Sequence, residues 1–328
     1  MISENEIFQL QQRVQHALTS YDWGMDPTTL SDPVEYVISL GGKRLRPVLC
    51  LLACKLYSDD ASIALKAAMG LEVFHNFTLL HDDIMDRADT RRGQMTVHKR
   101  WNDSAAILSG DAMLIKAYQL VGEVPQSVAP AVSRLFSQTA MEVCEGQQLD
   151  MDYEQRSDVT ISDYLRMIRL KTAVLLAASL KIGALLGGAD TFNQDKLYEF
   201  GLQLGLAFQL RDDYLDAFGD PKLFGKKTGG DIACNKKTYL LITALQRAQG
   251  EDRTELLDAL ALSSPEQREE KIRRVLAVYR KVGVQEATLE AIRKYDDLAM
   301  ACVYSLDLED DAKELLGRIA SDLAGREH

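Results

Sequence analysis

The sequence predicts an all-α protein, and three observations support that prediction. Hydrophobic side chains recur at spacings of three and four over most of the 328 residues, which is the period of an amphipathic helix. No alternating run is long enough to predict a β-strand. The chain has only seven prolines and none between Pro47 and Pro125, so long helices are not interrupted there. Because no Gly/Ser-rich linker divides the chain, we expect a single helical-bundle domain over residues 1–328.

The first three helices are defined by their periodicity and by the residues that end them. The first carries apolar residues at helical spacing from Ile7 onward and ends before Asp26-Pro27. The second, residues 29–40, is stopped by Gly41-Gly42. The third begins next to Pro47, because proline is tolerated in the first turn of a helix.

The fourth helix, residues 61–87, is the longest expected so far, at about 40 Å for a rise of 1.5 Å per residue. It is apolar nearly all round from Leu71 to Leu80, so we expect it to be buried at the centre of the domain. A polar loop, Ala88 to Gly93, follows. The later segments are helices at residues 101–121, 127–151, 160–187 and 191–218, a Gly- and Lys-rich loop at 219–236, and four or five shorter helices to about Leu323.

The charge balance restricts the class of ligand. A formal net charge of −11 argues against nucleic acid as a partner, because phosphate backbones bind to basic surfaces. A phosphorylated small molecule needs only a local basic pocket and is not excluded. The N-terminal residues are acidic and polar, unlike a secretory signal. The most apolar stretch, Ala173 to Leu186, contains Lys181 and is shorter than the roughly 20 residues that a membrane span requires, so we expect no membrane span.

The cysteines predict a reducing environment. None of the five forms a C-x-x-C pair, and their spacing gives neither a metal site nor a disulfide framework. Buried, reduced thiols are therefore the preferred interpretation, and a cytoplasmic location follows from it. The five are Cys50, Cys54, Cys144, Cys234 and Cys302.

Two segments with the pattern D-D-x-x-D lie about 130 residues apart. Their carboxylates are Asp82, Asp83 and Asp86 in the first cluster, and Asp212, Asp213 and Asp216 in the second. Three carboxylates within one helical turn repel each other, so a cation should offset the repulsion. Oxygen ligands favour hard cations, and magnesium is usually held by one or two carboxylates together with phosphate oxygens. A single cluster could be a solvated acidic helix face, but here each cluster follows an apolar run, and both copies together predict magnesium sites.

Basic residues accompany these clusters. Lys43, Arg44 and Arg46 follow Gly41-Gly42 at a helix start, where free backbone N–H groups favour an anion. The other basic groups are Arg91-Arg92, Lys171 beside Thr172, Lys226-Lys227 and Lys236-Lys237. Each alone would be ordinary surface charge, and the order of a P-loop is absent. Grouped near the aspartates of an acidic chain, they indicate diphosphate binding.

Taken together, these segments resemble the trans-isoprenyl diphosphate synthase family, of the short-chain type that includes farnesyl and geranylgeranyl diphosphate synthases. The matching motifs are Gly41 to Pro47, His81 to Asp86 with Arg91-Arg92-Gly93, Lys171-Thr172, and Phe208 to Asp216 with Gly225-Lys226. They cover the chain from about residue 30 to 240. The resemblance implies an all-α fold with the two aspartate motifs facing each other across a deep central cavity, prenyltransferase activity, and a homodimer.

The resemblance also implies a role for each matching residue. The six aspartates would form the magnesium-binding region, with about three Mg²⁺ ions per active site. The allylic diphosphate would be bound by Arg91, Lys171, Lys226 and Lys236, and isopentenyl diphosphate by Lys43, Arg46, His75 and Arg92. Of the catalytic residues Lys171, Thr172 and Gln209, the last two match positions that stabilise the developing carbocation.

Product length depends on the residues before the first cluster. Phe77 and Phe74 lie five and eight residues before Asp82, about 7–8 and 12 Å along a helix axis. In the family, bulk at the first of these positions forms a floor that stops elongation. The first motif also lacks the two-residue insertion of bacterial farnesyl synthases, so we expect a C20 product, with C15 next because Phe74 could shorten it. Both phenylalanines could instead be ordinary core residues.

Two other functions share parts of this pattern. A terpene cyclase has the same fold and first motif, but its second motif usually carries Asn and Ser or Thr, and it needs no site for isopentenyl diphosphate. A non-catalytic subunit of a heteromeric synthase usually lacks one aspartate motif. This chain has both aspartate motifs and the Gly42-Lys43-x-x-Arg46 element, which favours the prenyl diphosphate synthase.

Overall fold

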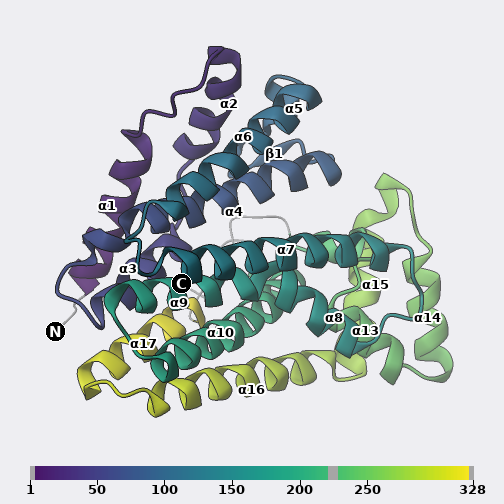
Figure 1. Cartoon of the computed structure of the whole chain (residues 1–328). Coiled ribbons are helices and arrows are strands. Elements are labelled where there is room, and N and C mark those ends of the chain that lie inside the picture. Colours follow the sequence, from purple (N-terminus) through teal and green to yellow (C-terminus); the bar gives the residue numbers. More distant parts are fainter. Residues whose placement is uncertain (1–3, 221–227, 325–328) are drawn as a thin grey trace. The chain divides into compact units, whose positions relative to one another are not determined.

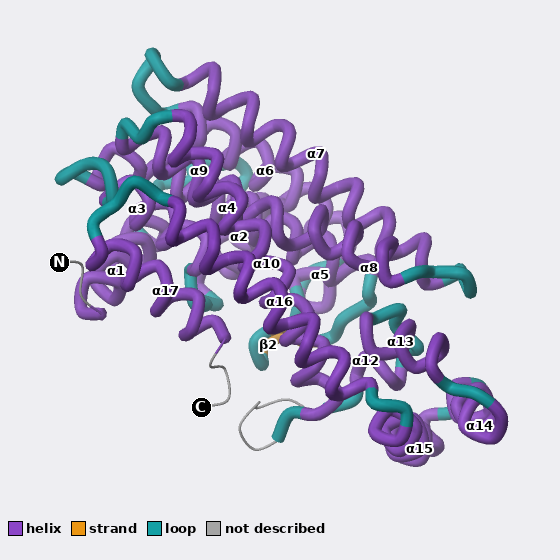
Figure 2. The backbone as a smooth tube through the Cα atoms, turned by 90° about the horizontal axis from the view of Figure 1, so that it is seen from below, coloured by secondary structure: helices purple, strands orange, loops and turns teal. Residues whose placement is uncertain are grey.

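The computed structural model describes residues 4–220 and 228–324. These residues form two compact units. The first unit comprises residues 4–139, 178–198 and 307–312, and the second comprises the other described residues. The division passes through four helices, α7 (Ala129–Glu154), α9 (Val174–Gly187), α10 (Thr191–Phe218) and α17 (Asp310–Ala324). Both units are built of helices, as Figures 1 and 2 show.

The first unit is organised around α4 (Leu65–Met85), which packs against α3 (Leu45–Lys55) and α6 (Asp103–Gly122). Seven of its residues between Leu71 and Leu80 are buried, which confirms the prediction of a buried helix. Close packing on α6 depends on Gly70, where a Cβ atom would lie 2.6 Å from a methyl group of Val121. The other elements are α1 (Glu4–Thr19), α2 (Thr28–Ser39), η1 (Ala61–Ala64), β1 (Thr90–Arg91), β2 (Gln94–Met95) and α5 (Val97–Arg100).

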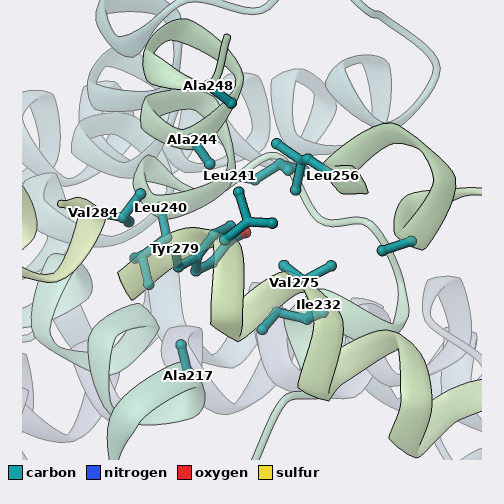
Figure 3. Packing of buried hydrophobic residues seen from close by; sticks show 12 residues of the cluster. Ala217, Ile232, Leu240, Leu241, Ala244, Ala248, Leu256, Val275, Tyr279 and Val284 are labelled. Carbon is teal, nitrogen blue, oxygen red and sulfur yellow. The ribbon is translucent and has the colours of Figure 1, made fainter. Parts of the chain in front are cut away.

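The second unit has a separate hydrophobic core around Tyr279 (Figure 3). Ala217 of α10 and Ile232 belong to this core, so the segments on either side of residues 221–227 pack into the same cluster. The remaining elements are α8 (Ile161–Ile168), η2 (Arg169–Ala173), α12 (Gly230–Ala233), α13 (Tyr239–Arg247), α14 (Gly250–Leu260), η3 (Pro265–Gln267), α15 (Arg268–Lys281) and α16 (Val284–Ser305).

The helix boundaries agree with the sequence prediction to within a few residues, and three local features differ. The loop after the first aspartate cluster contains a two-residue antiparallel hairpin, β1 and β2. The single helix expected at 160–187 is divided into α8, η2 and α9, and η2 is a π-helix. The expected loop at 219–236 contains α12, while its residues 221–227 lie outside the described part of the chain.

Among the residues that the structure describes, two helical stretches are long and apolar enough to cross a membrane. They are Ala61–Met85, with a mean hydropathy of 1.2, and Ile161–Gly187, with 1.6. However, 67% and 72% of their apolar windows are buried inside the protein. Core helices of globular proteins have this property, so burial within the fold accounts for both stretches.

The cysteines are free but only partly buried. Cys50 and Cys54 of α3 are buried, as predicted, and burial raises the pKa of both thiols. The prediction of burial is wrong for Cys144 and Cys234, which are exposed, and for Cys302, which is half-buried. Burial was inferred from the residue type, whereas exposure depends on which face of its helix a cysteine occupies.

Candidate active site

The first aspartate cluster ends α4. Asp83 is buried, Asp82 is half-buried, and Asp86 is the exposed C-cap. Negative charge is unfavourable at a helix C-terminus, and here Arg91 offsets part of it. The Arg91 Nε donates to both carboxylate oxygens of Asp83 at 2.9 Å, and its Nη2 lies 2.8 Å from one of them. The first cluster is therefore partly neutralised by a cation.

The β1–β2 hairpin brings Arg91 back to the cluster. Thr90 pairs with Met95 across the two strands, and the Tyr36 hydroxyl donates to the carbonyl oxygen of Met95 at 2.7 Å. Arg92 occupies the turn with φ of 53°. A short turn directly after α4 thus places two consecutive arginines near the aspartates, as their proximity in sequence suggested.

A second group of cations surrounds the start of α3. Arg44 is buried and has a left-handed backbone, with φ of 48°. Its guanidinium donates to Glu72 at 2.7 Å, to the carbonyl oxygen of Ile38 at 2.6 Å and to Gln15 at 2.9 Å. Arg44 therefore fixes the turn that carries Lys43 and Arg46. The sequence placed Arg44 among the cations of a predicted anion site, whereas the structure uses it to hold the turn, and the sequence gave no role to Glu72.

Arg46, Arg92 and His75 form a site with excess positive charge. The buried Nε atom of Arg46 finds no hydrogen-bond partner among the described residues. Burial lowers the pKa of Arg46 to about 10, although Glu72 acts in the opposite direction. Burial, and then the charges of Arg46 and Arg92, hold the pKa of His75 well below its usual value, so the ring is neutral. A guanidinium whose Nε lacks a partner, beside further arginines, is suited to bind an anion.

Arg92 also explains the glycines of this motif. Its guanidinium donates to the carbonyl oxygen of Gly41. A Cβ atom on Gly42 would lie 2.8 Å from the same guanidinium, and the φ of Gly42 is +129°. Any larger residue at position 42 would displace Arg92 or strain the backbone. Gly42 therefore lets a cation from the hairpin lie directly against the start of α3.

The second aspartate cluster lies in the last two turns of α10. Asp212 is exposed and Asp213 is buried. The Tyr164 hydroxyl donates to one oxygen of Asp213 at 2.6 Å, and the Gln209 amide donates to the other at 3.0 Å. The carboxylate of Asp216 accepts the backbone N–H groups that begin α12, at 3.2 and 3.0 Å. These donors are all neutral.

Carboxylate repulsion remains strong in this second cluster. Burial, and then the charge of Asp231, raise the pKa of Asp213 to about 7. Burial, with Asp216 and Asp212 nearby, raises the pKa of Asp231 to about 6, while Lys236 acts in the opposite direction. The sequence identified Lys236 but gave Asp231 no role, although that residue directly follows the Gly229-Gly230 turn.

Lys171 and Thr172 lie in the π-helix η2. The Lys171 ammonium donates to Asp150 at 2.6 Å, and the Thr172 hydroxyl donates to Gln209 at 3.2 Å. A Cβ atom on Gly146 would clash with the backbone nitrogen of Lys171, so the absence of a side chain lets α7 lie directly against η2. Single π-turns inside helices are frequent at functional sites, and this one aims two neighbouring polar side chains.

The clusters have the chemistry that magnesium requires. Their donors are carboxylate oxygens, and Asp86 and Asp212 are exposed to solvent, which suits a hard cation that keeps water and phosphate ligands. In the described part of the chain, no three His, Cys, Asp or Glu residues already converge on one point. Magnesium held by one or two carboxylates needs no such arrangement, because substrate oxygens complete its shell.

The two phenylalanines on α4 are both buried. Phe77 lies one turn before His81, with their ring centroids 4.8 Å apart. Phe74 packs against Phe77 and against Phe136 of α7, with centroids 5.6 and 5.4 Å apart. Phe77 is thus the phenylalanine nearer to the aspartates, and Phe74 lies deeper in an aromatic cluster.

Each unit of the structure brings together part of the predicted site. The first unit holds Lys43, Arg46, Phe74, His75, Phe77, Asp82, Asp83, Asp86, Arg91 and Arg92. The second holds Lys171, Thr172, Gln209, Asp212, Asp213, Asp216 and Lys236. Lys226 lies outside the described residues.

Comparison with known proteins gives a family match over most of the chain. The model of the polyprenyl synthetase family matches residues 27–279. The chain belongs to this family. It is therefore a prenyltransferase of isoprenoid synthesis with the all-α fold of isoprenoid synthases, as the sequence predicted.

Relatives of this polyprenyl synthetase cover nearly its whole length. The short chain isoprenyl diphosphate synthase of Methanothermobacter thermautotrophicus is 37% identical over 308 residues, which are 92% of each chain. The geranylfarnesyl diphosphate synthase of Aeropyrum pernix is 34% identical over 92% of this chain and 95% of its own. A crystal structure of a geranylgeranyl pyrophosphate synthase has a TM-score of 0.93 and 44% identity, with both chains fully covered.

Proposed function

We propose that this polyprenyl synthetase condenses isopentenyl diphosphate with an allylic diphosphate to make a short-chain trans-prenyl diphosphate, with C20 as the main product and C15 next. The main support is the cation-rich site of Arg46, Arg92 and neutral His75 in a chain of net charge −11. Relatives named as short-chain and geranylgeranyl synthases support the product class. In this proposal, residues 1–328 form a single isoprenoid-synthase domain.

Isopentenyl diphosphate is bound by Lys43, Arg46, His75 and Arg92. The unpartnered Nε of Arg46 supports this role, because a diphosphate oxygen would satisfy it. Neutral His75 can donate one hydrogen bond without adding a further charge to the arginine group. Glu72, paired with Arg44, limits the repulsion among these cations before substrate binds.

The allylic diphosphate is bound by Arg91, Lys171, Lys226 and Lys236, and by Mg²⁺ at the two aspartate clusters. When about three Mg²⁺ ions are bound, they draw negative charge from the leaving diphosphate. The residues that would hold them are Asp82, Asp83, Asp86, Asp212, Asp213 and Asp216. Lys171 and Arg91 add positive charge where the diphosphate leaves. The oxygens of Thr172 and Gln209 stabilise the allylic cation, and their mutual hydrogen bond of 3.2 Å supports a shared role.

The reaction then needs no protein nucleophile. The allylic C–O bond breaks and its electron pair leaves with the diphosphate. The double bond of isopentenyl diphosphate forms the new C–C bond to the cation, and a proton is lost to the departed diphosphate. Binding both substrates in alignment supplies much of the acceleration, and exclusion of water prevents quenching of the cation.

We propose Phe77 as the floor that limits product length. Its buried ring lies on α4 one turn before His81. The expected result of Phe77→Ala is a shift from C20 toward C25 or longer products, because the removed ring leaves space for further isoprene units. Chromatography of dephosphorylated products checks this, and an unaltered product distribution would assign Phe77 to the ordinary core. Phe74→Ala should lengthen the product less, because Phe74 lies one turn deeper.

A homodimer in the cytoplasm is the expected state. One face of α6 exposes Ile107, Leu108 and Ile115, each between 46% and 60% accessible. Exposed apolar residues grouped on one helix usually mark a protein interface. A second copy of the chain is the partner that the family implies, and sedimentation of the purified protein tests it.

The function itself is tested by product analysis of the purified chain with Mg²⁺, isopentenyl diphosphate and each allylic starter. We expect a C20 diphosphate only when isopentenyl diphosphate is present. Cyclic hydrocarbons formed from the allylic substrate alone would instead show a terpene cyclase. Inactivity that a second protein relieves would show a subunit of a heteromeric synthase.

A further inference from the structure

A chain of hydrogen bonds lies behind the second aspartate cluster. The Thr172 hydroxyl donates to Oε1 of Gln209 at 3.2 Å, and Nε2 of Gln209 donates to Asp213 at 3.0 Å. The Tyr164 hydroxyl donates to the other oxygen of Asp213 at 2.6 Å. All four residues belong to the second unit. Tyr164 lies outside every motif that the sequence analysis singled out.

Tyr164 is firmly held. Its side chain is only 1% exposed, and its ring packs edge-on against Tyr239 with centroids 6.4 Å apart. It lies in the first turn of α8, which a capping box between Thr160 and Asp163 fixes at its N-terminus. The phenol hydroxyl is the donor in its 2.6 Å hydrogen bond to Asp213, because an ionised carboxylate can only accept.

The direction of these bonds determines how Gln209 is oriented. Asp213 accepts two hydrogen bonds, so Gln209 must turn its NH₂ group toward the carboxylate. The amide oxygen of Gln209 then faces Thr172, as the bond from the Thr172 hydroxyl requires. If the Asp213 carboxylate rotated, the hydrogen bond from Nε2 of Gln209 would be lost. The amide of Gln209 could then flip and turn its nitrogen toward Thr172.

We propose that Tyr164 is a positioning residue for prenyl transfer. Its hydroxyl fixes the Asp213 carboxylate, and through it directs the amide oxygen of Gln209 toward Thr172 of η2. This inference rests on the proposed function, in which Gln209 and Thr172 stabilise the cation and Asp213 belongs to the magnesium-binding region. Tyr164 does not touch the reacting atoms and acts only through Asp213.

The test is Tyr164→Phe, which keeps the ring and removes only the hydroxyl. Tyr239→Phe is the matched control, because that ring packs against Tyr164 and lies outside the chain of hydrogen bonds. We expect kcat of Tyr164→Phe to fall about 10–100-fold, as for other residues that orient metal ligands, while KM for isopentenyl diphosphate stays within about twofold. The control should change neither value by more than about twofold.

A second readout does not depend on turnover. Isothermal titration calorimetry of farnesyl thiodiphosphate at increasing Mg²⁺ gives the Mg²⁺ concentration for half-maximal binding. We expect this midpoint to rise about tenfold in Tyr164→Phe. In an Asp213→Asn background, the same substitution should change the midpoint by less than about twofold, because Tyr164 acts through Asp213.

Either of two results would overturn the proposal. One is a kcat and a Mg²⁺ midpoint for Tyr164→Phe that match the Tyr239→Phe control. The other is an equal effect of Tyr164→Phe in the wild-type protein and in the Asp213→Asn background. Circular dichroism verifies that each variant keeps its helices. A wild-type protein that makes no prenyl product would contradict the proposed function alone, because the calorimetric midpoint tests Tyr164 without turnover.

Discussion

The two aspartate clusters share one sequence pattern, yet their second carboxylates are stabilised differently. Asp83 is paired with the guanidinium of Arg91, which lies eight residues later in strand β1 of the hairpin. Asp213 accepts hydrogen bonds from two neutral groups, Tyr164 and Gln209, and lies near Asp231. Neutral donors do not cancel the charge as Arg91 does, and Lys236 offsets only part of it, because the pKa of Asp213 is still raised. We therefore expect the second cluster to depend more on a bound cation than the first.

The last carboxylate of each cluster also differs. Asp86 is the exposed C-cap of α4. Asp216 is half-buried and accepts the two N–H groups that begin α12. A substrate-bound metal can approach Asp86 from solvent, whereas Asp216 also fixes the segment that carries Asp231 and Lys236. In the second cluster, a predicted metal ligand thus also positions the segment that begins with α12.

The largest expected effect is on turnover. Asp82→Ala and Asp212→Ala should each lower kcat by about 10²–10³, the loss seen when one electrostatic contact to a reaction's developing charge is removed. Circular dichroism should show unchanged helix content. Steady-state assays with saturating substrates measure the effect. Unchanged turnover in either variant would contradict the magnesium role of that cluster.

The next effect compares two helix glycines, Gly146 against η2 and Gly110 against the ring of His81. In Gly146→Ala the new methyl group meets backbone of Lys171, whereas in Gly110→Ala it meets the ring of His81, a side chain that can rotate. Overpacking against backbone should lower the free energy of unfolding by about 1–3 kcal/mol. We expect Gly146→Ala to lose more stability than Gly110→Ala.

Urea unfolding and kcat measure this difference. Gly146→Ala should also lower kcat, because it displaces η2 with Lys171 and Thr172. Both glycines lie inside helices, so each variant gains about 1 kcal/mol of helix propensity, and the difference between them reports the clash alone. Equal losses of unfolding free energy in the two variants would contradict the prediction that a clash with the backbone of Lys171 costs more than a clash with the ring of His81.

The smallest effect compares the two second carboxylates in metal-free protein at pH 8. Above pH 7 Asp213 is charged, because its pKa is raised to about 7, and that buried charge destabilises the fold. Asp213→Asn should therefore raise the melting temperature or leave it unchanged. Asp83→Asn should lower the melting temperature, because Arg91 loses its charged partner. The corresponding loss of unfolding free energy is about 1 kcal/mol. Thermal unfolding measures both, and a lower melting temperature for Asp213→Asn would contradict the comparison.

Much of this architecture could be predicted from the sequence. The helices follow from hydrophobic spacing, and α10 begins and ends at the expected residues, 191 and 218. The aspartates and the basic groups form local motifs, so their residue types and order were enough to propose them as site residues. Phe77 was likewise located by counting back along a helix.

The missing parts depend on contacts between distant residues. Tyr164 and Asp213 are 49 positions apart, and Arg44 and Glu72 are 28 apart. From the sequence alone, Tyr164 would be assigned to the apolar face of an amphipathic helix. Glu72 is a single acidic residue within an apolar run, and the sequence does not show its partner. The π-turn at Lys171 packs closely against Gly146, and helical periodicity does not show it.

The most direct test counts the Mg²⁺ ions that bind with farnesyl thiodiphosphate. Equilibrium dialysis of the wild-type protein should give about three Mg²⁺ ions per chain at saturation. Asp82→Ala and Asp212→Ala should each bind fewer, because each cluster supplies ligands of its own. If both variants bound as many ions as the wild type, with unchanged affinity for the thiodiphosphate, the aspartate clusters would not be the magnesium sites.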